Sequence, residues 1–459
     1  MYQIDLKKPV NVFFCGIGGI SMSGIAELLT DFGSKVSGSD RAESSLTKKL
    51  SLKGVEVFIG QKASNITENI DVFVYTAAIH KDHPEMMAAS GLGLPMLTRA
   101  EILGQIMKNY KMPIAVSGTH GKTTVTSMIS EILLAADTDP TLFVGGVLDS
   151  IDGNLRIGHS DMFVTEACEY TNSFLSFFPK ASIILNIEAD HLDFFKDIDD
   201  IRNSFHTFAG ISPADGVVII NGDIDRVERI TENIASSVIT FGKDANSNYY
   251  PSEIGFDRFG AASFVVNAPG FEKESFSLSI PGTHNIYNAL AAVAMADYLG
   301  IDRAITKKVL SSFKGAKRRF EYKGEVNGIT VIDDYAHHPT EIAATLNAAA
   351  RIPHKALWCV FQPHTYTRTK ELLDDFTKAL TLSDYVILAD IYAARETDNL
   401  GISSVTLQKK IKEAGTTCYY FPSFKEIEKF ILETCTPGDM LITMGAGDVV
   451  NIGNELLKE

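Results

Sequence analysis

The sequence lacks the features that would place the chain in a membrane, outside the cell or on nucleic acid. Its five cysteines are widely scattered and form no C-x-x-C pair, which argues against a disulfide framework or a cysteine-ligated zinc site. No run of about 18 apolar residues occurs, so no membrane span is expected. Basic residues are outnumbered, and the net charge of -15 argues against nucleic-acid or anionic-membrane partners. These absences predict a cytoplasmic protein with reduced, buried thiols.

What the chain has is a repeated succession of apolar strand, small-residue loop and helix. Strands that alternate with helical segments predict parallel sheets and an α/β architecture. The 459 residues are enough for about three domains. We predict a Rossmann-like domain over residues 1–108, a central P-loop ATPase-like α/β domain over 109–313 and a C-terminal Rossmann-like α/β domain over 314–459. Antiparallel strands are expected near 242–280.

The first glycine-rich loop, FFCGIGGIS, matches a dinucleotide-binding fingerprint only in part. Gly16 and Gly18 fit G-x-G-x-x-G/A, but Ser21 occupies the third position. Asp40 follows Gly16 by 24 residues, about where a ribose-binding acid belongs. The loop indicates a nucleotide or diphosphate at a helix N-terminus, with NAD as one candidate and an unliganded turn as the alternative.

A second loop, GTHGKTT at residues 118–124, is too short for the usual P-loop. In G-x-x-x-x-G-K-[ST] the first glycine would stand where this chain has Val116. The context is nevertheless that of a P-loop, because an apolar strand precedes the loop and a periodic helical segment follows it. Backbone amides and the helix dipole would attract an anion there. Lys122 would reach the terminal phosphates and Thr123 would hold magnesium, whereas an ordinary strand-to-helix turn is the alternative.

Two acidic segments, FVTEACEY and LNIEADHLD, follow strands of the central region. Ligands of α/β sheets bind at the carboxyl ends of strands, and carboxylate or imidazole groups there could hold a second divalent cation. The alternative is a helix N-cap beside a solvated histidine. The candidate side chains are Glu166, Glu169, Glu188, Asp190, His191 and Asp193.

The last third of the chain concentrates polar residues around predicted strands, in GAKRRFE, DDYAHHPTE, FQPHTYTRT and GAGD. Four such clusters suggest a polar crevice for an anionic, amine-bearing substrate, although any one alone could be a satisfied loop. Before them, Asn285 and Asn288 lie three apart on one predicted helix face, where N-capping is the alternative role. The clusters contain Arg318, Arg319, Asp333, Asp334, Tyr335, His337, His338, His364, Arg368 and Asp448.

Taken in order, these motifs resemble the Mur ligases of peptidoglycan synthesis. The family's own loop is G-T-x-G-K-T-T, which accounts for the short spacing, and the likeness covers nearly the whole chain. GIGGISMSGIAELL and SGSD are similar to the members that add L-alanine to UDP-N-acetylmuramate. The resemblance implies an ATP- and magnesium-dependent ligase that works through an acyl phosphate and releases ADP and phosphate. It also implies that the first loop holds UDP rather than NAD.

The resemblance further implies roles for individual residues. The nucleotide would contact Gly118, Thr119, His120, Gly121, Lys122, Thr123, Thr124, Asn285, Asn288, Arg319 and Asp334. The sugar nucleotide and the amino acid would contact Gly16, Gly18, Gly19, Ser39, Asp40, Tyr335, His337, His364 and Arg368. Metal ions would be held by Thr123, Glu166 and His191. Catalysis would depend on Lys122, Arg319, His337 and Arg368.

Two departures and three alternatives remain open. The stretch IRNSFHTFA lacks the carbamoylated lysine of several family members, and Thr365 stands where some alanine-adding members have arginine. One alternative is a recycling ligase that adds a preformed murein peptide to the same sugar nucleotide. The others are an NAD-dependent dehydrogenase and a catalytically inactive UDP-sugar sensor, and the intact P-loop and acidic segments argue against both.

Overall fold

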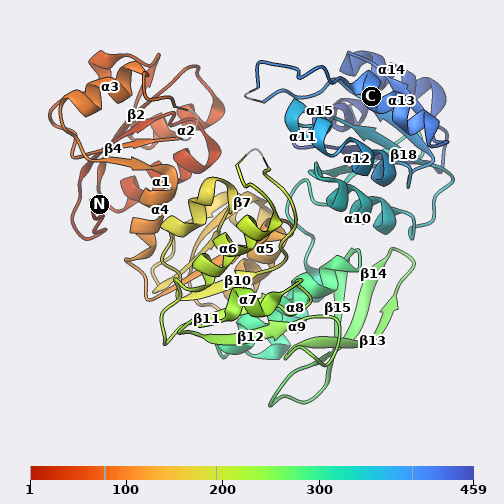
Figure 1. The fold of residues 1–459 in the computed structure, drawn as a ribbon, viewed down its shortest axis with the longest axis horizontal. Coiled ribbons are helices and arrows are strands. Elements are labelled where there is room, and N and C mark those ends of the chain that lie inside the picture. The colour runs from red at the N-terminus through yellow and green to blue at the C-terminus, as the bar shows by residue number, and fades with distance from the viewer. Residues whose placement is uncertain (1, 77–78, 193, 395, 459) are drawn as a thin grey trace.

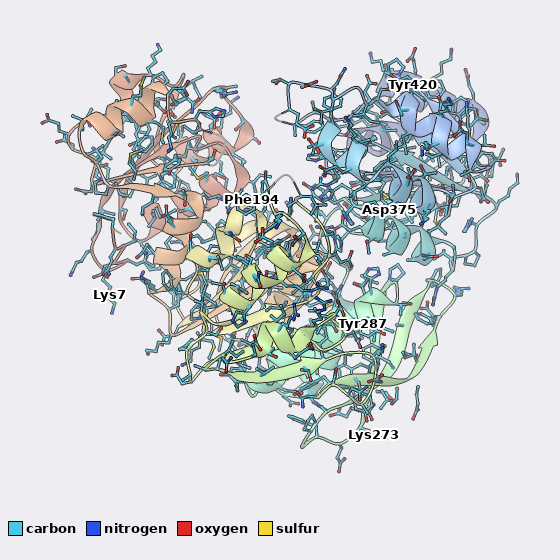
Figure 2. The ribbon with its side chains drawn as sticks, in the orientation of Figure 1. Lys7, Phe194, Lys273, Tyr287, Asp375 and Tyr420 are labelled. Atoms are coloured by element: carbon cyan, nitrogen blue, oxygen red, sulfur yellow. The ribbon has the colours of Figure 1, made fainter. Side chains whose placement is uncertain are left out.

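Three α/β domains follow one another in the computed structural model, with the central domain lying between the other two (Figure 1). The structure describes residues 2–76, 79–192, 194–394 and 396–458. Lys7, Tyr287 and Asp375 mark the N-terminal, central and C-terminal domains among the side chains of Figure 2. The α/β class and the three-domain architecture are confirmed, whereas the boundaries after residues 108 and 313 stay predictions.

The N-terminal domain is built on a five-stranded parallel sheet with the order β3-β2-β1-β4-β5. Apolar side chains bury the central strand β1 almost completely, and glycines then turn the chain into α1. Its strands are β1 (Asn11–Cys15), β2 (Lys35–Asp40), β3 (Glu56–Ile59), β4 (Val72–Tyr75) and β5 (Met96–Thr98). Its helices are α1 (Ile20–Asp31), α2 (Ser45–Leu52), η1 (Ala63–Asn65), α3 (Pro84–Gly91) and α4 (Arg99–Met107).

The central domain combines a seven-stranded sheet, ordered β12-β11-β10-β6-β9-β7-β8, with a three-stranded antiparallel sheet, β13-β14-β15. The antiparallel strands expected near 242–280 are therefore confirmed. The large sheet contains β6 (Met112–Ser117), β7 (Thr141–Leu148), β8 (Gly153–Arg156), β9 (Met162–Glu166), β10 (Ala181–Ile184), β11 (Val217–Asn221) and β12 (Ser237–Phe241). The small sheet contains β13 (Tyr250–Phe256), β14 (Ala261–Asn267) and β15 (Glu274–Pro281). The helices are α5 (Lys122–Ala135), η2 (Asp149–Ile151), η3 (Tyr170–Ser176), α6 (Ile198–Ala209), α7 (Val227–Thr231), α8 (His284–Tyr298) and α9 (Arg303–Ser312).

The C-terminal domain has a six-stranded sheet, ordered β16-β17-β21-β18-β19-β20, in which only the pairing of β16 with β17 is antiparallel. Its strands are β16 (Glu321–Val326), β17 (Ile329–Asp334), β18 (Leu357–Phe361), β19 (Tyr385–Leu388), β20 (Thr417–Tyr420) and β21 (Met440–Met444). Its helices are α10 (Pro339–Ala349), α11 (Tyr366–Glu371), α12 (Leu373–Leu380), α13 (Ser404–Glu413), α14 (Phe424–Thr434) and α15 (Val450–Leu456). No helix in the described part of the chain is both long and apolar enough to cross a membrane.

The first two domains share one apolar core. A single cluster of buried apolar side chains runs from Ile4 in the N-terminal domain to Ile230 in the central domain. The helices α1 and α4 approach the central domain through glycines: a Cβ on Gly24 would lie 2.8 Å from the ring of Phe143. The C-terminal domain instead has apolar clusters made of its own residues. Its contacts with the central domain include hydrogen bonds and ion pairs, which are described below.

The contact of α4 with the central domain gives a stability prediction. An added Cβ on Gly104 would overlap the carbonyl oxygen of Ser176. Glycine-to-alanine changes in a helix normally stabilise by roughly 1 kcal/mol. We expect Gly104→Ala to destabilise instead, by about 1–3 kcal/mol, because the helix must move away from the central domain. Urea unfolding measures the change.

The matched control is Gly91→Ala, at the end of α3, where an added Cβ meets nothing within 4 Å. This control should leave stability unchanged or slightly raised. Equal stabilities of the two variants would contradict the close approach of α4 to the central domain.

Candidate active site

The short glycine loop joins β6 to α5, in the place that a phosphate-binding loop requires. Gly118 has φ of 141°, and a Cβ there would lie 3.0 Å from the Cβ of Leu185. Gly121 has φ of 83°, and a Cβ there would lie 2.8 Å from Oδ1 of Asn288. Both positions favour glycine because φ is positive and a side chain would clash. The loop backbone can therefore lie against β10 and α8.

Lys122 folds back over this loop and pairs with a carboxylate of the central domain. Its Nζ donates to the carbonyl oxygen of Thr119 (3.1 Å) and lies 3.1 Å from Oε2 of Glu169, whose side chain is 3% exposed. Burial lowers the pKa of Lys122, but Glu169 together with Cys168 and Glu166 outweighs burial and raises this pKa above its ordinary value. Lys122 therefore carries a positive charge that already has a partner.

Two of the predicted metal ligands lie over consecutive glycines of β7. The amide of Gly145 donates to Oε1 of Glu166 (2.7 Å), and a Cβ there would lie 2.6 Å from that oxygen. A Cβ on Gly146 would lie 3.1 Å from Cγ2 of Thr123. Hydroxyl and carboxylate oxygens are the ligands that magnesium prefers, so the donor set fits this ion.

The third predicted metal ligand, His191, lies beside Glu169. Its ring stacks on Tyr170 with centroids 4.4 Å apart, and its Nε2 is 3.7 Å from Oε1 of Glu169. His191 lines a different cavity from Glu166. The remaining candidate of this segment, Asp193, lies outside the described residues.

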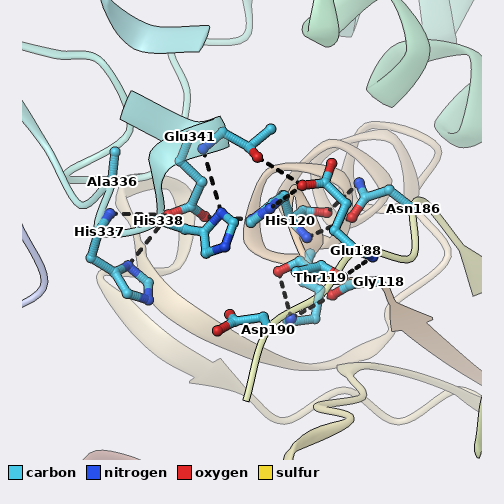
Figure 3. A network of polar contacts seen from close by, with 12 residues as sticks. Gly118, Thr119, His120, Asn186, Glu188, Asp190, Ala336, His337, His338 and Glu341 are labelled. Atoms are coloured by element: carbon cyan, nitrogen blue, oxygen red, sulfur yellow. Dashed lines mark hydrogen bonds and ion pairs between the residues drawn. The ribbon is translucent and has the colours of Figure 1, made fainter. Parts of the chain in front are cut away.

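His120 of the loop connects the central and C-terminal domains (Figure 3). Its Nε2 lies 3.2 Å from Oε2 of Glu188, and its Nδ1 lies 3.1 Å from Oε1 of Glu341 on α10. The Thr340 hydroxyl also donates to Glu188 (2.8 Å). Burial lowers the pKa of His120, but the two carboxylates outweigh it and raise the pKa to about 9. His120 is thus a buried cation between two domains.

One cavity, of about 190 Å³, gathers most of the predicted nucleotide-binding residues. Asn288 donates to Asn285 (2.9 Å), and Asn285 donates to the carbonyl of Pro281, so these asparagines bind each other and the backbone. Thr283, the N-cap residue of α8, makes no side-chain capping bond. Burial raises the pKa of Asp334 to about 6. Predicted residues in the lining are His120, Gly121, Thr124, Asn285, Asn288, Arg319 and Asp334.

A second cavity, of about 390 Å³, lies between the central and C-terminal domains. Arg368 donates to Asp190 across the domains (3.3 Å) and to Nδ1 of His364 (3.4 Å), and both residues line the cavity. The charge of Arg368 lowers the pKa of Asp190 although burial opposes this. Tyr335 and His337 are not in the lining, but the His337 ring lies 5.9 Å from that of His364. Arg368, His191 and His364 line this cavity and are therefore available to contact a carboxylate and an amine.

The first glycine loop lies at the carboxyl ends of β1 and β2. The amides of Gly16 and Ile17 donate to the carbonyl of Ser39, and the amide of Gly18 donates to Oδ2 of Asp40 (2.8 Å). Asp40 is thus turned toward the glycine loop. Because this carboxylate already binds the loop, it differs from the free ribose-binding acid of a dinucleotide site.

A third cavity, of about 210 Å³, lies between the N-terminal and central domains and reaches Glu166. Arg99, which the sequence did not single out, lines this cavity and donates to Ser21 (3.1 Å). Burial lowers the pKa of Arg99. Its position directly after β5, at the edge where ligands bind, would have marked it only if β5 had been predicted. Glu341 was not predicted either, because its partner His120 is distant in the chain.

Several polar residues singled out in the C-terminal region hold the domain together. Arg318 donates to Asp333 (3.0 Å) and to the carbonyls of Gly445 and Gly447, so it fixes a loop, unlike the neighbouring Arg319. Nδ1 of His338 caps α10. Asp448 accepts from Gln362, and Thr365 caps α11.

Comparison with known proteins accounts for all three domains. The Mur ligase family catalytic domain matches residues 11–111, the Mur ligase middle domain matches 116–296, and the Mur ligase glutamate ligase domain matches 318–447. The UDP-N-acetylmuramate–L-alanine ligase of Agathobacter rectalis is 58% identical over 459 residues, all of both chains. The chain belongs to the Mur ligase family.

Further relatives agree with this Mur ligase assignment. The UDP-N-acetylmuramate–L-alanine ligase of Lachnospira eligens is 56% identical over all of both chains. Among solved structures, the UDP-N-acetylmuramate-alanine ligase of Thermotoga maritima matches with a TM-score of 0.81 and 29% identity over 98% of each chain. A murein peptide ligase from Psychrobacter arcticus matches with a TM-score of 0.73 and 25% identity, also over 98% of each chain.

The raised pKa of His120 predicts a loss of stability in alkaline solution. Its pKa is about 9 in the folded chain and 6.5 when unperturbed, so its contribution is complete below pH 6.5. The contribution, on the order of 2 kcal/mol after solvent screening at Glu188, is lost as pH rises through about 9. Urea unfolding across this range should show the decline, and His120→Gln should flatten it.

The control is His159→Gln, because the His159 side chain is 89% exposed and pairs with Asp139. This variant should keep the pH dependence of the unmodified chain. A decline that persists in His120→Gln would show that another group causes it.

Proposed function

We propose that this chain joins L-alanine to the carboxylate of UDP-N-acetylmuramate at the expense of ATP, in peptidoglycan precursor synthesis. The curated relatives that match over the full length are named UDP-N-acetylmuramate–L-alanine ligase. The observation that carries the proposal is a chain of polar side chains in contact, from Lys122 through Glu169 to His191. Lys122 directly follows the loop that lines the smaller cavity, and His191 lines the larger one. The terminal phosphate of ATP and the amine of L-alanine can thus meet beside these groups. The reaction would take place in the cytoplasm, where ATP is available.

On the nucleotide side, the loop amides and α5 would hold the phosphates of ATP. Lys122 would exchange Glu169 for the terminal phosphate, and Arg319 would approach from the C-terminal domain. Thr123 and Glu166 would hold magnesium, with His191 as a further ligand candidate. Bound magnesium would supply positive charge to the phosphoryl group during transfer.

On the acceptor side, Arg368 provides a guanidinium suited to the carboxylate of L-alanine. His337 can take the amine proton. Its Nδ1 lies 3.1 Å from the carbonyl of Tyr335, and a carbonyl only accepts, so Nδ1 carries the proton and Nε2 keeps its lone pair. Burial lowers the pKa of His337 to about 4, which keeps the ring neutral at physiological pH.

The chemistry requires activation because hydroxide is a poor leaving group from a carboxylate. The sugar carboxylate attacks the terminal phosphorus of ATP, and ADP leaves. The amine of L-alanine then attacks the acyl phosphate, gives up a proton to the pocket base, and phosphate departs from the tetrahedral intermediate. Lys122 and Arg319 offset the charge that develops on the transferred group. Docking of the C-terminal domain completes the site, since both Arg319 and Arg368 come from it.

The recycling ligase is the second candidate, because the murein peptide ligase shares the whole fold. It has less support, since that relative is 25% identical to this chain, whereas the L-alanine ligase of Agathobacter rectalis is 58% identical. The UDP end of the substrate is assigned to Gly16, Gly18, Gly19, Ser39 and Asp40, beside the cavity lined by Arg99.

Lys122→Met should lower turnover by about 10²–10³-fold while the fold is kept, because one preorganised charge contact is lost. Phosphate release with saturating substrates measures the effect. Lys111→Met is the matched control, because Lys111 also pairs with a carboxylate, Asp161, but its side chain is 84% exposed. Near-normal turnover of Lys122→Met would contradict the proposed role of the loop.

An isotope experiment tests both the activation step and the acceptor. UDP-N-acetylmuramate labelled with heavy oxygen in the carboxylate should pass one label to phosphate in each turnover, with ADP as the other product. Label in AMP, or in neither AMP nor phosphate, would exclude an acyl phosphate. The same assay with L-alanine and with the murein tripeptide as competing acceptors should show transfer to L-alanine, whereas preferred transfer to the peptide would support the recycling ligase.

A further inference from the structure

Cys15, His83 and Glu85 meet at the carboxyl edge of the N-terminal sheet, apart from the ATP site. Cys15 is the last residue of β1, His83 precedes α3 and Glu85 lies in the first turn of α3. One ligand atom from each lies within 4.8 Å of the other two. Strand β1 lies between β2 and β4, where the strand order reverses. Open α/β sheets bind ligands outside the carboxyl ends of strands at such a point.

The histidine of this group has an unprotonated ring nitrogen near the thiol, and a metal ion would compete for its lone pair with the Glu85 amide. Its Nε2 lies 3.3 Å from Oε1 of Gln61, which can only accept, so Nε2 carries the proton. Its Nδ1 accepts from the amide of Glu85 (3.3 Å) and lies 3.9 Å from Sγ of Cys15. A tetrahedral zinc ion would separate sulfur and nitrogen by about 3.6 Å. The observed spacing is therefore close to that of a ligand pair.

The carboxylate of Glu85 is fully buried, at 0% exposed. It accepts from the Ser39 hydroxyl (2.6 Å), the Asn65 amide (2.7 Å) and the backbone of Lys62 (3.2 Å). In the described ranges of the chain, no lysine or arginine side chain forms an ion pair with it. Buried carboxylates are normally paired with a cation or bound to a metal. Three neutral donors leave the charge of Glu85 without an opposite charge.

A thiol proton now occupies the space among these groups. The Cys15 thiol lies beside Glu85, and burial together with Glu85 raises the pKa of Cys15. The amide of Gln61 also donates to Sγ (3.4 Å). A divalent cation in the same space would displace the proton, leaving a thiolate, and would offset the charge of Glu85.

We propose that Cys15, His83 and Glu85 bind a borderline-soft divalent cation, of which Zn²⁺ is the representative. The set of one sulfur, one nitrogen and one oxygen suits zinc, whereas the oxygen ligands proposed for the ATP site suit magnesium. Three protein ligands leave one position for water or for Gln61. The hydrogen bond from Nε2 of His83 to Gln61 orients the ring, as partners of metal-binding histidines do. The site adjoins the loop that begins at Gly16, because Cys15 directly precedes this glycine.

Cobalt binding tests the proposal directly. The full-length protein is freed of metal with a chelator and titrated with Co²⁺ in excess Mg²⁺. We expect one equivalent of Co²⁺ to produce the ultraviolet charge-transfer band of a thiolate–cobalt bond, and Zn²⁺ to remove this band. Cys15→Ser should abolish the band. His83→Asn keeps the thiol but should weaken Co²⁺ binding by at least about 10-fold.

The control is Cys435→Ser, a partly buried cysteine of the C-terminal domain, which should keep the band. Circular dichroism confirms that each variant is folded, and His83→Asn tests the site if Cys15→Ser does not fold. The proposal is overturned if the unmodified protein gives no thiolate band, if Cys15→Ser keeps it, or if His83→Asn binds Co²⁺ as tightly as the unmodified protein.

Discussion

The positive charge of the P-loop is balanced by the protein's own carboxylates, and the arrangement of the site depends on this balance. Lys122 pairs with Glu169, and His120 lies between Glu188 and Glu341. Buried cations need such partners because desolvation is costly. Since Glu341 belongs to the C-terminal domain, the charge of the loop also holds that domain in place. The phosphates of ATP would compete for the same cations, so nucleotide binding and domain docking are coupled through one set of groups.

The two domain interfaces differ in kind, and the difference suits their proposed roles. The N-terminal domain is joined to the central domain by a continuous apolar core, which has no alternative partner in water. The C-terminal domain meets the central domain through pairs such as Arg368 with Asp190, and polar pairs can exchange partners. The sugar-nucleotide side is thereby fixed, whereas the side that supplies Arg319 and Arg368 can dock and release. Movements of this kind complete the site in many enzymes with several substrates.

The sequence was informative where structure is local and uninformative where contacts cross the chain. In the outer domains, short apolar segments such as VNVFFCG, DVFVYTAAI, KALWCVFQ and DYVILADIY predict the central strands β1, β4, β18 and β19. No comparable segment predicts β3, β5, β16 or β20. All four are edge strands, which are less buried and carry a weaker apolar pattern. Motif order predicted that Asn285 and Arg319 contact one nucleotide, and both line the same cavity. The resemblance selected Arg319, but no pattern predicted that Arg318 fixes a loop. Glu341 and Arg99 were missed because their partners are distant in sequence. The group of Cys15, His83 and Glu85 was not predicted for the same reason, since His83 lies 68 positions from Cys15 in the sequence.

The shared core of the first two domains determines how this protein can be recombined. A chimera that exchanged only the N-terminal domain with a relative would have to match every side chain that crosses to Phe143 and its neighbours, where even one methyl group on Gly24 does not fit. The C-terminal domain has its own apolar clusters. It meets the central domain through polar pairs such as Arg368 with Asp190 and Glu341 with His120. In modular terms the chain therefore has two exchangeable parts: the N-terminal and central domains form one inherited unit, and the C-terminal domain forms the other.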